Sequence, residues 1–322
     1  MRFSSLINLE ENLLQTGNNG EYALTKIAIP VKDEPLVLTG MLTVPKNRSK
    51  YYYAVEHPKQ RIVLHFTAGQ LRSDLSALTR DNYHVSVAFV IGRDGTVYQL
   101  FSSKYWSGHL GKGIGNTNTG NAQDKCTIGI EISNYGYLAE RNGNLETYYS
   151  RQQNAQGQEG PVDVYCSLDE KQAWLKTDSP FRGQSYYAAY TNEQMESLVI
   201  LLRYLTTQYG IPRAFLPEPK RYEATEDVLT FNGIVSHINY RPTGKWDIGP
   251  AFNWNKLITQ VQAPVFEPQF TKTENIPGTR GMRGDAKAPL GSEDQLDAIL
   301  PEPIDASLEN EPYEEMPLLE KQ

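Results

Sequence analysis

Five side chains in three separate segments could together perform hydrolysis at a metal ion. His65 ends the apolar run RIVLHF, and Glu131 lies within the run TIGIEIS. His237 begins a later segment that also contains Lys245 and Asp247. Two imidazoles and one carboxylate suit Zn²⁺, and a catalytic zinc keeps a fourth position for water. Such a centre would keep one positive charge and lower the pKa of its water toward about 7.

Spacing alone leaves other interpretations open for each of these residues. His237 and Asp247 lie ten positions apart, and the Pro and Gly between them would let the loop fold back onto one ion. The set nevertheless matches neither HExxH nor a paired-cysteine pattern. A lone His is more often packed or exposed than a ligand, and a lone Asp in such a loop is usually a turn residue. Glu131 could face solvent or a cleft, and Lys245 alone is by default a solvated charge.

Short strands are predicted to hold these residues. Residues 61–66 and 127–133 are apolar and β-branched, which is typical of buried strands. Residues 84–101 read as two apolar strands around Asp94-Gly95, a residue pair typical of hairpin turns. Further strands are expected at 26–31, 36–44 and 234–238.

One helix has both ends marked in the sequence. Residues 191–209 begin with Thr191 and Gln194, which can form a capping box, and stop before Gly210. Apolar residues recur within this segment at helical spacing, so we expect it to pack on the core. Further helices are expected at 71–80 and at about 250–261.

Five segments resemble, in the same order, a known family. They are LHFTAG, FVIGRDGTVYQLF, WSGHLG, TIGIEISN and HINYRPTGKWDIGPAFNW. Their order is similar to that of type-2 N-acetylmuramoyl-L-alanine amidases, a group that includes phage amidases and peptidoglycan recognition proteins. The resemblance covers about residues 60–134 and 190–258. It implies an α/β fold with one central mixed sheet of about five strands flanked by helices.

The resemblance also implies a role for each candidate residue. The zinc ligands of the family fall on His65, His237 and Asp247. Glu131 would accept the proton of the attacking water and pass it to the leaving amine. Lys245 would stabilise the oxyanion. His109 matches a position at which the family contacts substrate, although a histidine in a Gly-rich loop is the alternative. Thr67, directly after the first ligand, could line the cleft or only close a turn.

The activity implied is zinc-dependent hydrolysis of the amide bond between N-acetylmuramic acid and L-alanine, in peptidoglycan or in muropeptides. One alternative is a module that binds peptidoglycan without cutting it. Another is the amidase part of a phage or secreted-toxin assembly.

Three regions are expected along the chain. Residues 1–58 would form an N-terminal extension or a small β subdomain. Residues 59–262 would form the zinc amidase domain, and its insertion at about 135–190 is rich in Tyr, Gln, Asn and Gly, which indicates little regular structure. Residues 263–322 would form an acidic, Pro-rich and largely disordered tail. The tail could dock on a protein partner, or it could serve only for solubility.

Charge and composition exclude several other classes of protein. The net charge is −7, from 31 basic and 38 acidic residues, and no basic stripe suggests nucleic-acid binding. No apolar run is long enough for a membrane span. The first residues lack signal-peptide features, so we expect a cytoplasmic protein as synthesised, with export or phage-mediated release as alternatives. Cys126 and Cys166 are expected to be free thiols, although a single bridge is the other option.

Overall fold

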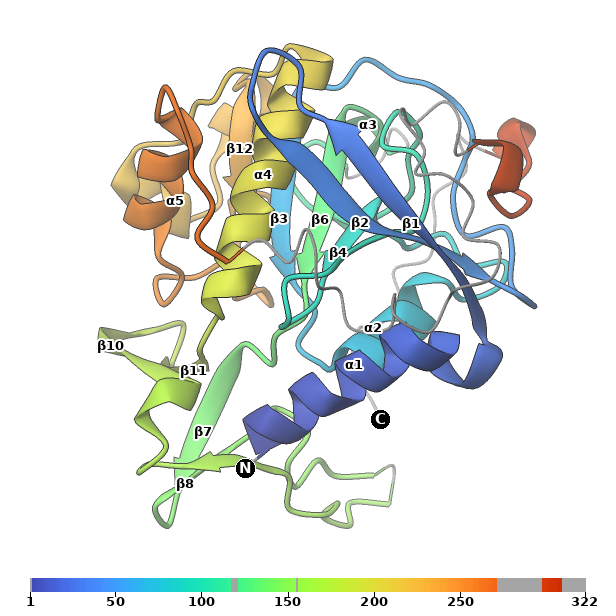
Figure 1. Ribbon diagram of the computed structural model, residues 1–322. Helices are drawn as coiled ribbons and strands as arrows, with labels where there is room; N and C mark the ends of the chain where they lie inside the picture. The colour runs from blue at the N-terminus through green and yellow to red at the C-terminus, as the bar shows by residue number, and fades with distance from the viewer. Residues whose placement is uncertain (1, 117–120, 155, 271–296, 309–322) are drawn as a thin grey trace.

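The main structural unit is a seven-stranded mixed sheet. The computed structural model describes residues 2–116, 121–154, 156–270 and 297–308 (Figure 1). Across the sheet the strands follow the order β1 (Tyr22–Pro30), β2 (Val37–Pro45), β5 (Val97–Gln99), β4 (Phe89–Ile91), β6 (Thr127–Ile132), β3 (Arg61–Phe66) and β12 (Gly233–Ser236). The expected α/β fold class is confirmed, with two more strands in this sheet than we expected.

Four neighbouring strands run parallel in one half of this sheet. The strands β4, β6, β3 and β12 pair in parallel, and nearly every residue of the last three is buried. Side chains buried on both faces account for the continuous apolar runs in the sequence. Because the strands are parallel, their carboxyl ends meet at one edge, where α/β sheets usually bind ligands.

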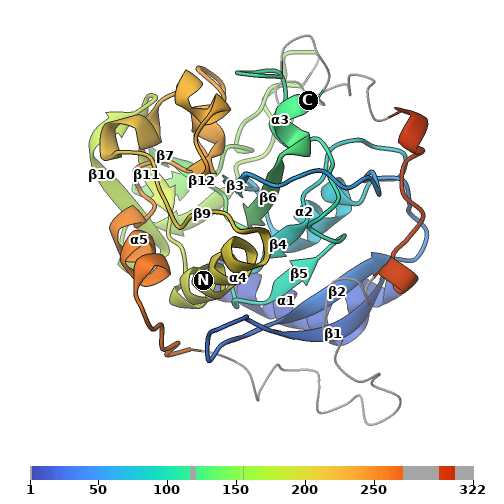
Figure 2. The same cartoon turned by 90° about the horizontal axis from the view of Figure 1, so that it is seen from above.

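Helices cover both faces of the sheet. Figure 2 shows α4 on one face and α2 and α3 on the other. The helices are α1 (Arg2–Gly20), α2 (Leu71–Leu78), α3 (Ala122–Lys125), α4 (Asn192–Tyr209) and α5 (Trp254–Gln262). Short 3-10 helices occupy Lys171–Ala173, Glu218–Tyr222, Glu226–Leu229, His237–Asn239, Asp297–Ile299 and Ala306–Leu308. The predicted capping box of Thr191 and Gln194 is present, and Gly210 ends α4 in the left-handed conformation.

The N-terminal segment is built into the main sheet. The predicted strands at 26–31 and 36–44 are β1 and β2, which pair antiparallel, and β2 pairs with β5. Residues 1–58 therefore do not form a separate β subdomain. The helix α1 was not predicted, although Leu6, Leu13 and Leu14 recur at helical spacing. The predicted hairpin is confirmed, since β4 and β5 pair antiparallel around Asp94-Gly95.

The insertion forms a second sheet, so the prediction of little regular structure was wrong. Its strands follow the order β10 (Trp174–Phe181), β11 (Gln184–Ala188), β7 (Tyr137–Arg141), β8 (Asn144–Glu146) and β9 (Val164–Ser167), and neighbours are antiparallel. Its tyrosines build a core of their own, in which Tyr135 and Tyr165 pack together with rings 5.5 Å apart. The second sheet lies below the main sheet in Figure 1.

The helix α1 joins the two sheets. Leu6 belongs to the apolar cluster of the second sheet, whereas Leu13 and Leu14 belong to the main core. Between them, the buried carboxylate of Glu10 accepts a hydrogen bond from Arg93 at 3.1 Å. No helix among the described residues is long and apolar enough to cross a membrane.

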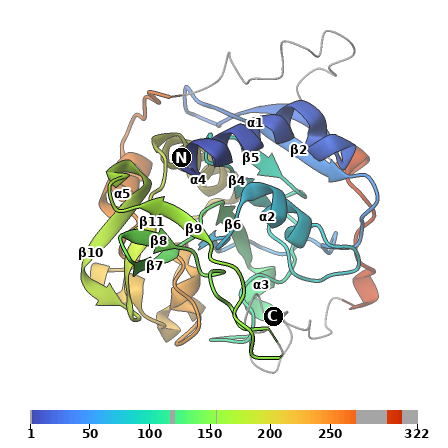
Figure 3. The same ribbon diagram turned by 90° about the horizontal axis from the view of Figure 1, so that it is seen from below.

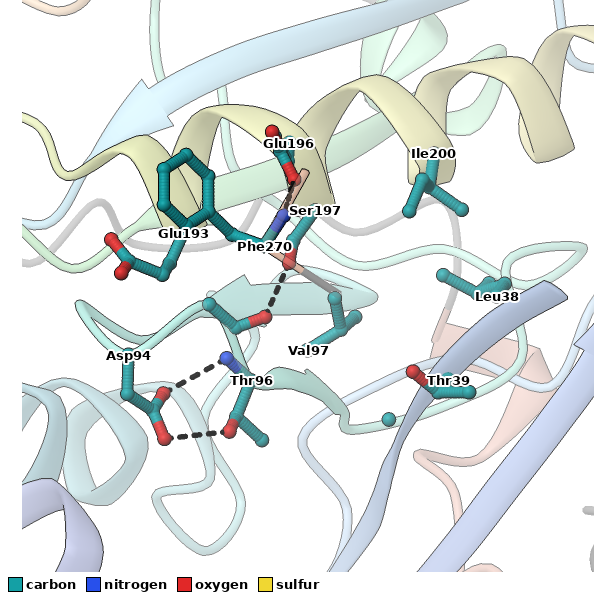
Figure 4. Close-up of a pocket in the computed structure, with 12 residues that line it drawn as sticks. Leu38, Thr39, Asp94, Thr96, Val97, Glu193, Glu196, Ser197, Ile200 and Phe270 are labelled. Carbon is teal, nitrogen blue, oxygen red and sulfur yellow. Dashed lines mark hydrogen bonds between the residues drawn. The ribbon is translucent and has the colours of Figure 1, made fainter. Parts of the chain in front are cut away.

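Two parts of the tail pack on the body, although we expected disorder there. Residues 263–270 contact α4 at Glu196. Its carboxylate accepts hydrogen bonds from the backbone N–H group of Gln269 and from that of Phe270, which Figure 4 shows. Further along, Ile304 packs with Tyr53 and Trp106. The rest of the tail, at 271–296 and 309–322, lies outside the described residues. Both cysteines are free thiols, as expected.

Candidate metal centre

The predicted ligands meet at the carboxyl edge of the parallel strands. His65 in β3 and Glu131 in β6 are partners in the parallel ladder, and His237 directly follows β12. The loop after His237 then folds back, and its two ends are joined by a hydrogen bond of 2.9 Å from the backbone N–H of Ile238 to the carbonyl of Asp247. In the view from below, β6 lies between the second sheet and α2 (Figure 3).

Three ligand atoms converge tightly at this edge. The Nδ1 atoms of His65 and His237 lie 2.9 Å apart. The Oδ2 atom of Asp247 lies 2.9 Å from Nδ1 of His237 and 3.2 Å from Nδ1 of His65. Tetrahedral zinc with bonds of about 2.0–2.1 Å holds its ligand atoms about 3.3 Å apart. All three side chains are buried, so the predicted set forms a compact candidate metal site.

Hydrogen bonding fixes the tautomer of His237. Its Nε2 lies 3.0 Å from the carbonyl oxygen of Leu110. A carbonyl oxygen can only accept, so Nε2 of neutral His237 must carry the proton. Its Nδ1 therefore keeps a lone pair that faces His65 and Asp247. A metal-bound histidine usually donates its other ring nitrogen in this way.

A longer chain of hydrogen bonds fixes the tautomer of His65. The hydroxyl of Thr127 donates to the carbonyl of Gln123 at 2.7 Å, so it accepts from Nε2 of His109 at 2.9 Å. The Nδ1 of His109 must then accept, and Nε2 of His65 donates to it at 2.9 Å. This leaves a lone pair on Nδ1 of His65. Two facing lone pairs repel each other, and a shared cation between them removes that repulsion.

The charges of the three groups agree with a cation site. Burial, followed by the nearby His237, lowers the pKa of His65 to about 4, so this imidazole is neutral at pH 7. Burial alone would raise the pKa of Asp247, but the two imidazoles beside it hold that pKa well below its usual value. The set presents two imidazole nitrogens and one carboxylate, which is the donor set that suits Zn²⁺.

Glu131 lies beside the cluster with a carboxyl oxygen that has no hydrogen-bond partner among the described residues. Burial raises the pKa of Glu131 well above its usual value, and the carboxylates of Asp247 and Asp74 raise it further. Lys245 acts in the opposite direction on Glu131, so its ammonium lies near enough to interact with the same site. A carboxyl group held like this is suited to take up and return a proton.

The two predicted substrate contacts have internal partners instead. His109 is the residue that orients His65, and its side chain is 5% exposed. The hydroxyl of Thr67 accepts from the backbone N–H groups of Gly69 and Asn134, both at 3.3 Å, and so joins the loops that follow β3 and β6. Contact of His109 or Thr67 with substrate stays a prediction.

Two residues near the centre were missed in the sequence. Tyr190 is close enough to Asp247 and Glu131 for both carboxylates to raise the pKa of its phenol, although burial is the larger cause. Arg182, at the tip of a hairpin in the second sheet, contacts the loop that ends at Asp247. Both lie at 135–190, for which the sequence offered no recognisable motif.

The fold and the site together define a mixed α/β protein with a buried two-histidine, one-carboxylate centre at the carboxyl edge of its sheet. The family model described as N-acetylmuramoyl-L-alanine amidase matches residues 56–250, which is more than half of the chain. The chain therefore belongs to the N-acetylmuramoyl-L-alanine amidase family. The resemblance seen in the sequence is confirmed. No curated protein matches the chain.

Several solved amidase structures are similar to this chain. The amidase AmiD from E. coli, in complex with anhydro-N-acetylmuramic acid-L-Ala-D-gamma-Glu-L-Lys, is 18% identical with a TM-score of 0.39; the match covers 74% of this chain and 66% of AmiD. The endolysin LysCS from Clostridium intestinale is 14% identical with a TM-score of 0.33, over 66% of this chain and 90% of LysCS. AmpDh3 from Pseudomonas aeruginosa, in complex with anhydromuramic pentapeptide, is 18% identical with a TM-score of 0.36, over 67% of this chain and 65% of AmpDh3.

Proposed function

We propose that this chain is a zinc-dependent amidase that cleaves the bond between N-acetylmuramic acid and L-alanine in peptidoglycan or its soluble fragments. The observation that carries the proposal is the convergence of the ligand atoms of His65, His237 and Asp247. Beside them, one carboxyl oxygen of Glu131 has no hydrogen-bond partner among the described residues. Membership of the amidase family supports the choice of bond and substrate.

The residues divide the chemistry between them. His65, His237 and Asp247 would hold the zinc ion. Bound zinc would supply a Lewis acid that polarises the scissile carbonyl and acidifies water. Glu131 takes the proton of the attacking water and delivers it to the nitrogen of the leaving L-alanine. Lys245 donates a hydrogen bond to the oxygen that becomes negative in the transition state.

The arrangement of Glu131 fits this proton transfer. Burial favours its neutral form, so a proton that it accepts is held rather than lost to solvent. Its free oxygen has no hydrogen-bond partner among the described residues, so no other protein group competes for the proton that it would accept. Glu131 would transfer the proton, and Lys245 would stabilise the negative charge of the transition state, so the two roles belong to different residues.

The test compares zinc-loaded protein with protein stripped by a chelator, on intact sacculi and on soluble anhydro-muropeptides. Mass spectrometry should detect free stem peptide that begins with L-alanine, and only with metal present. Glu131→Gln should retain zinc and lose about 10²–10⁴-fold in rate. Glu226→Gln is the control for loss of a carboxylate, because Glu226 is exposed. If zinc-loaded protein binds muropeptides but releases no peptide, the chain is a peptidoglycan-binding module and not an amidase.

A further inference from the structure

The second sheet reaches the metal centre through one hairpin tip. The strands β10 and β11 are joined by Arg182 and Gly183, which lie between the paired residues Phe181 and Gln184. Both turn residues have positive φ, at 48° and 82°. Two such residues in a row define the type I′ turn, in which Asn-Gly or Asp-Gly is the usual sequence. An arginine at the first position is unusual, because residues with long side chains rarely adopt this conformation.

The side chain of this arginine spans the loop that carries Lys245 and Asp247. One terminal nitrogen of Arg182 donates to the carbonyl of Lys245, and the other donates to the carbonyl of Arg241 at 3.2 Å. In return, the indole N–H of Trp246 donates to the carbonyl of Arg182 at 3.2 Å. Three hydrogen bonds therefore join one turn residue to both ends of the loop.

Aromatic packing strengthens the same contact. The ring of Trp246 lies 4.8 Å from that of Tyr137, which belongs to β7 in the second sheet. Burial lowers the pKa of Arg182, and the carboxylate of Asp247 acts on it in the opposite direction, which places this charge within electrostatic range of the third ligand. Trp246, between Lys245 and Asp247, thus contacts one strand and one turn of the insertion.

We propose that Arg182 is a positioning residue for the candidate metal site, and that the insertion fixes the loop conformation in which Asp247 faces His65 and His237. The side chain touches neither the ligand atoms nor the reacting groups. It acts by satisfying two backbone carbonyls of a loop that would otherwise be tied mainly by its ends. This inference rests on the proposed metal site.

The experiment measures metal affinity without substrate. Apo protein is titrated with Zn²⁺ against a chromophoric chelator, and with Co²⁺ to record the visible absorption that reports ligand geometry. Arg182→Ala should bind Zn²⁺ about 10–100-fold more weakly, as is usual when a group supporting a metal ligand is lost. Arg182→Lys should recover part of this loss, since one carbonyl can still be satisfied. Lys176→Ala removes the same charge from the exposed part of the same hairpin and should change nothing.

A second variant keeps the test decisive if Arg182→Ala does not fold. Trp246→Phe removes the hydrogen bond to the carbonyl of Arg182 and keeps an aromatic ring beside Tyr137. It should weaken Zn²⁺ binding and alter the Co²⁺ spectrum in the same direction. Wild-type affinity and spectrum in every folded variant would overturn the proposal. An equal loss in Lys176→Ala would also overturn it, because the insertion would then act only through general stability. Failure of the wild type to bind metal would instead reject the proposed function.

Discussion

Replacement of His109 by leucine should weaken zinc binding although His109 is not one of the three ligands. In the wild type, Nε2 of His65 donates to Nδ1 of His109, which keeps the Nδ1 lone pair of His65 directed at the ligand cluster. Without this acceptor, neutral His65 can move its proton to Nδ1 and donate to Asp247, whose Oδ2 lies 3.2 Å away. Metal binding would then have to drive the proton back to Nε2.

The magnitude follows from the burial of His65. The residue is 1% exposed, so water cannot easily replace the lost acceptor. A buried donor without a partner costs about 1–3 kcal/mol. This cost is absent from the apo state, where the tautomer has switched, and falls on the metal-bound state. We therefore expect binding to weaken by about 5- to 150-fold.

The assay is competition for Zn²⁺ between the apo protein and a chelator of known affinity, with thermal unfolding of both apo proteins as the control for folding. His109→Gln offers a side-chain oxygen as acceptor and should recover part of the affinity. Thr127→Val removes the acceptor at the other end of the chain of hydrogen bonds and should act in the same direction as His109→Leu. Equal zinc affinity in His109→Leu and the wild type would refute the tautomer argument.

Three further predictions concern other parts of the molecule. Lys245→Met should lower kcat by about 10²–10³-fold while zinc affinity stays the same, and a loss of zinc affinity instead would assign Lys245 to the metal site. Burial raises the pKa of Glu10 from 4.5 to about 7, so its contribution to stability is complete below pH 4.5 and is lost as the pH rises through 7. The unfolding temperature of Glu10→Gln should therefore rise relative to that of the wild type as the pH increases from 4.5 to 7. An equal pH dependence of the two unfolding temperatures would contradict the raised pKa of Glu10. Ile304→Ala should lower the free energy of urea unfolding by about 2 kcal/mol, whereas Glu302→Gln, which is more exposed, should be nearly neutral; equal values would show that this part of the tail adds no stability.

The ligand set was predicted through the resemblance to the amidase family, because spacing alone left other interpretations open. The strands that hold His65 and Glu131 were predicted from local patterns. The run before His65 and the run around Glu131 are apolar on both faces, so each reads as a buried strand. Parallel neighbours place their carboxyl ends together, and this brings distant residues to one edge. The same reasoning could not assign His109, since its role depends on Thr127 and on a carbonyl oxygen that no spacing rule identifies.

The insertion was misread for a physical reason as well. Few residues of β7, β10 and β11 are fully buried, and their polar residues and tyrosines produce no clear alternation. The core that holds them mixes aromatic and aliphatic side chains, and one of its members is Leu6, far away in the chain. Arg182 was missed because its function depends on the shape of a turn and not on a motif.

Because α1 contributes side chains to both apolar cores, the two sheets share one structural support. The second sheet buries Leu6, and the main core buries Leu13 and Leu14, and all three residues belong to α1. Unfolding of the second sheet should therefore destabilise the main sheet. Both sheets should unfold in one cooperative thermal transition and not in two. Heat or denaturant that loosens this helix should also release the hairpin tip at the ligand loop, so zinc would dissociate in the same step in which the second sheet unfolds.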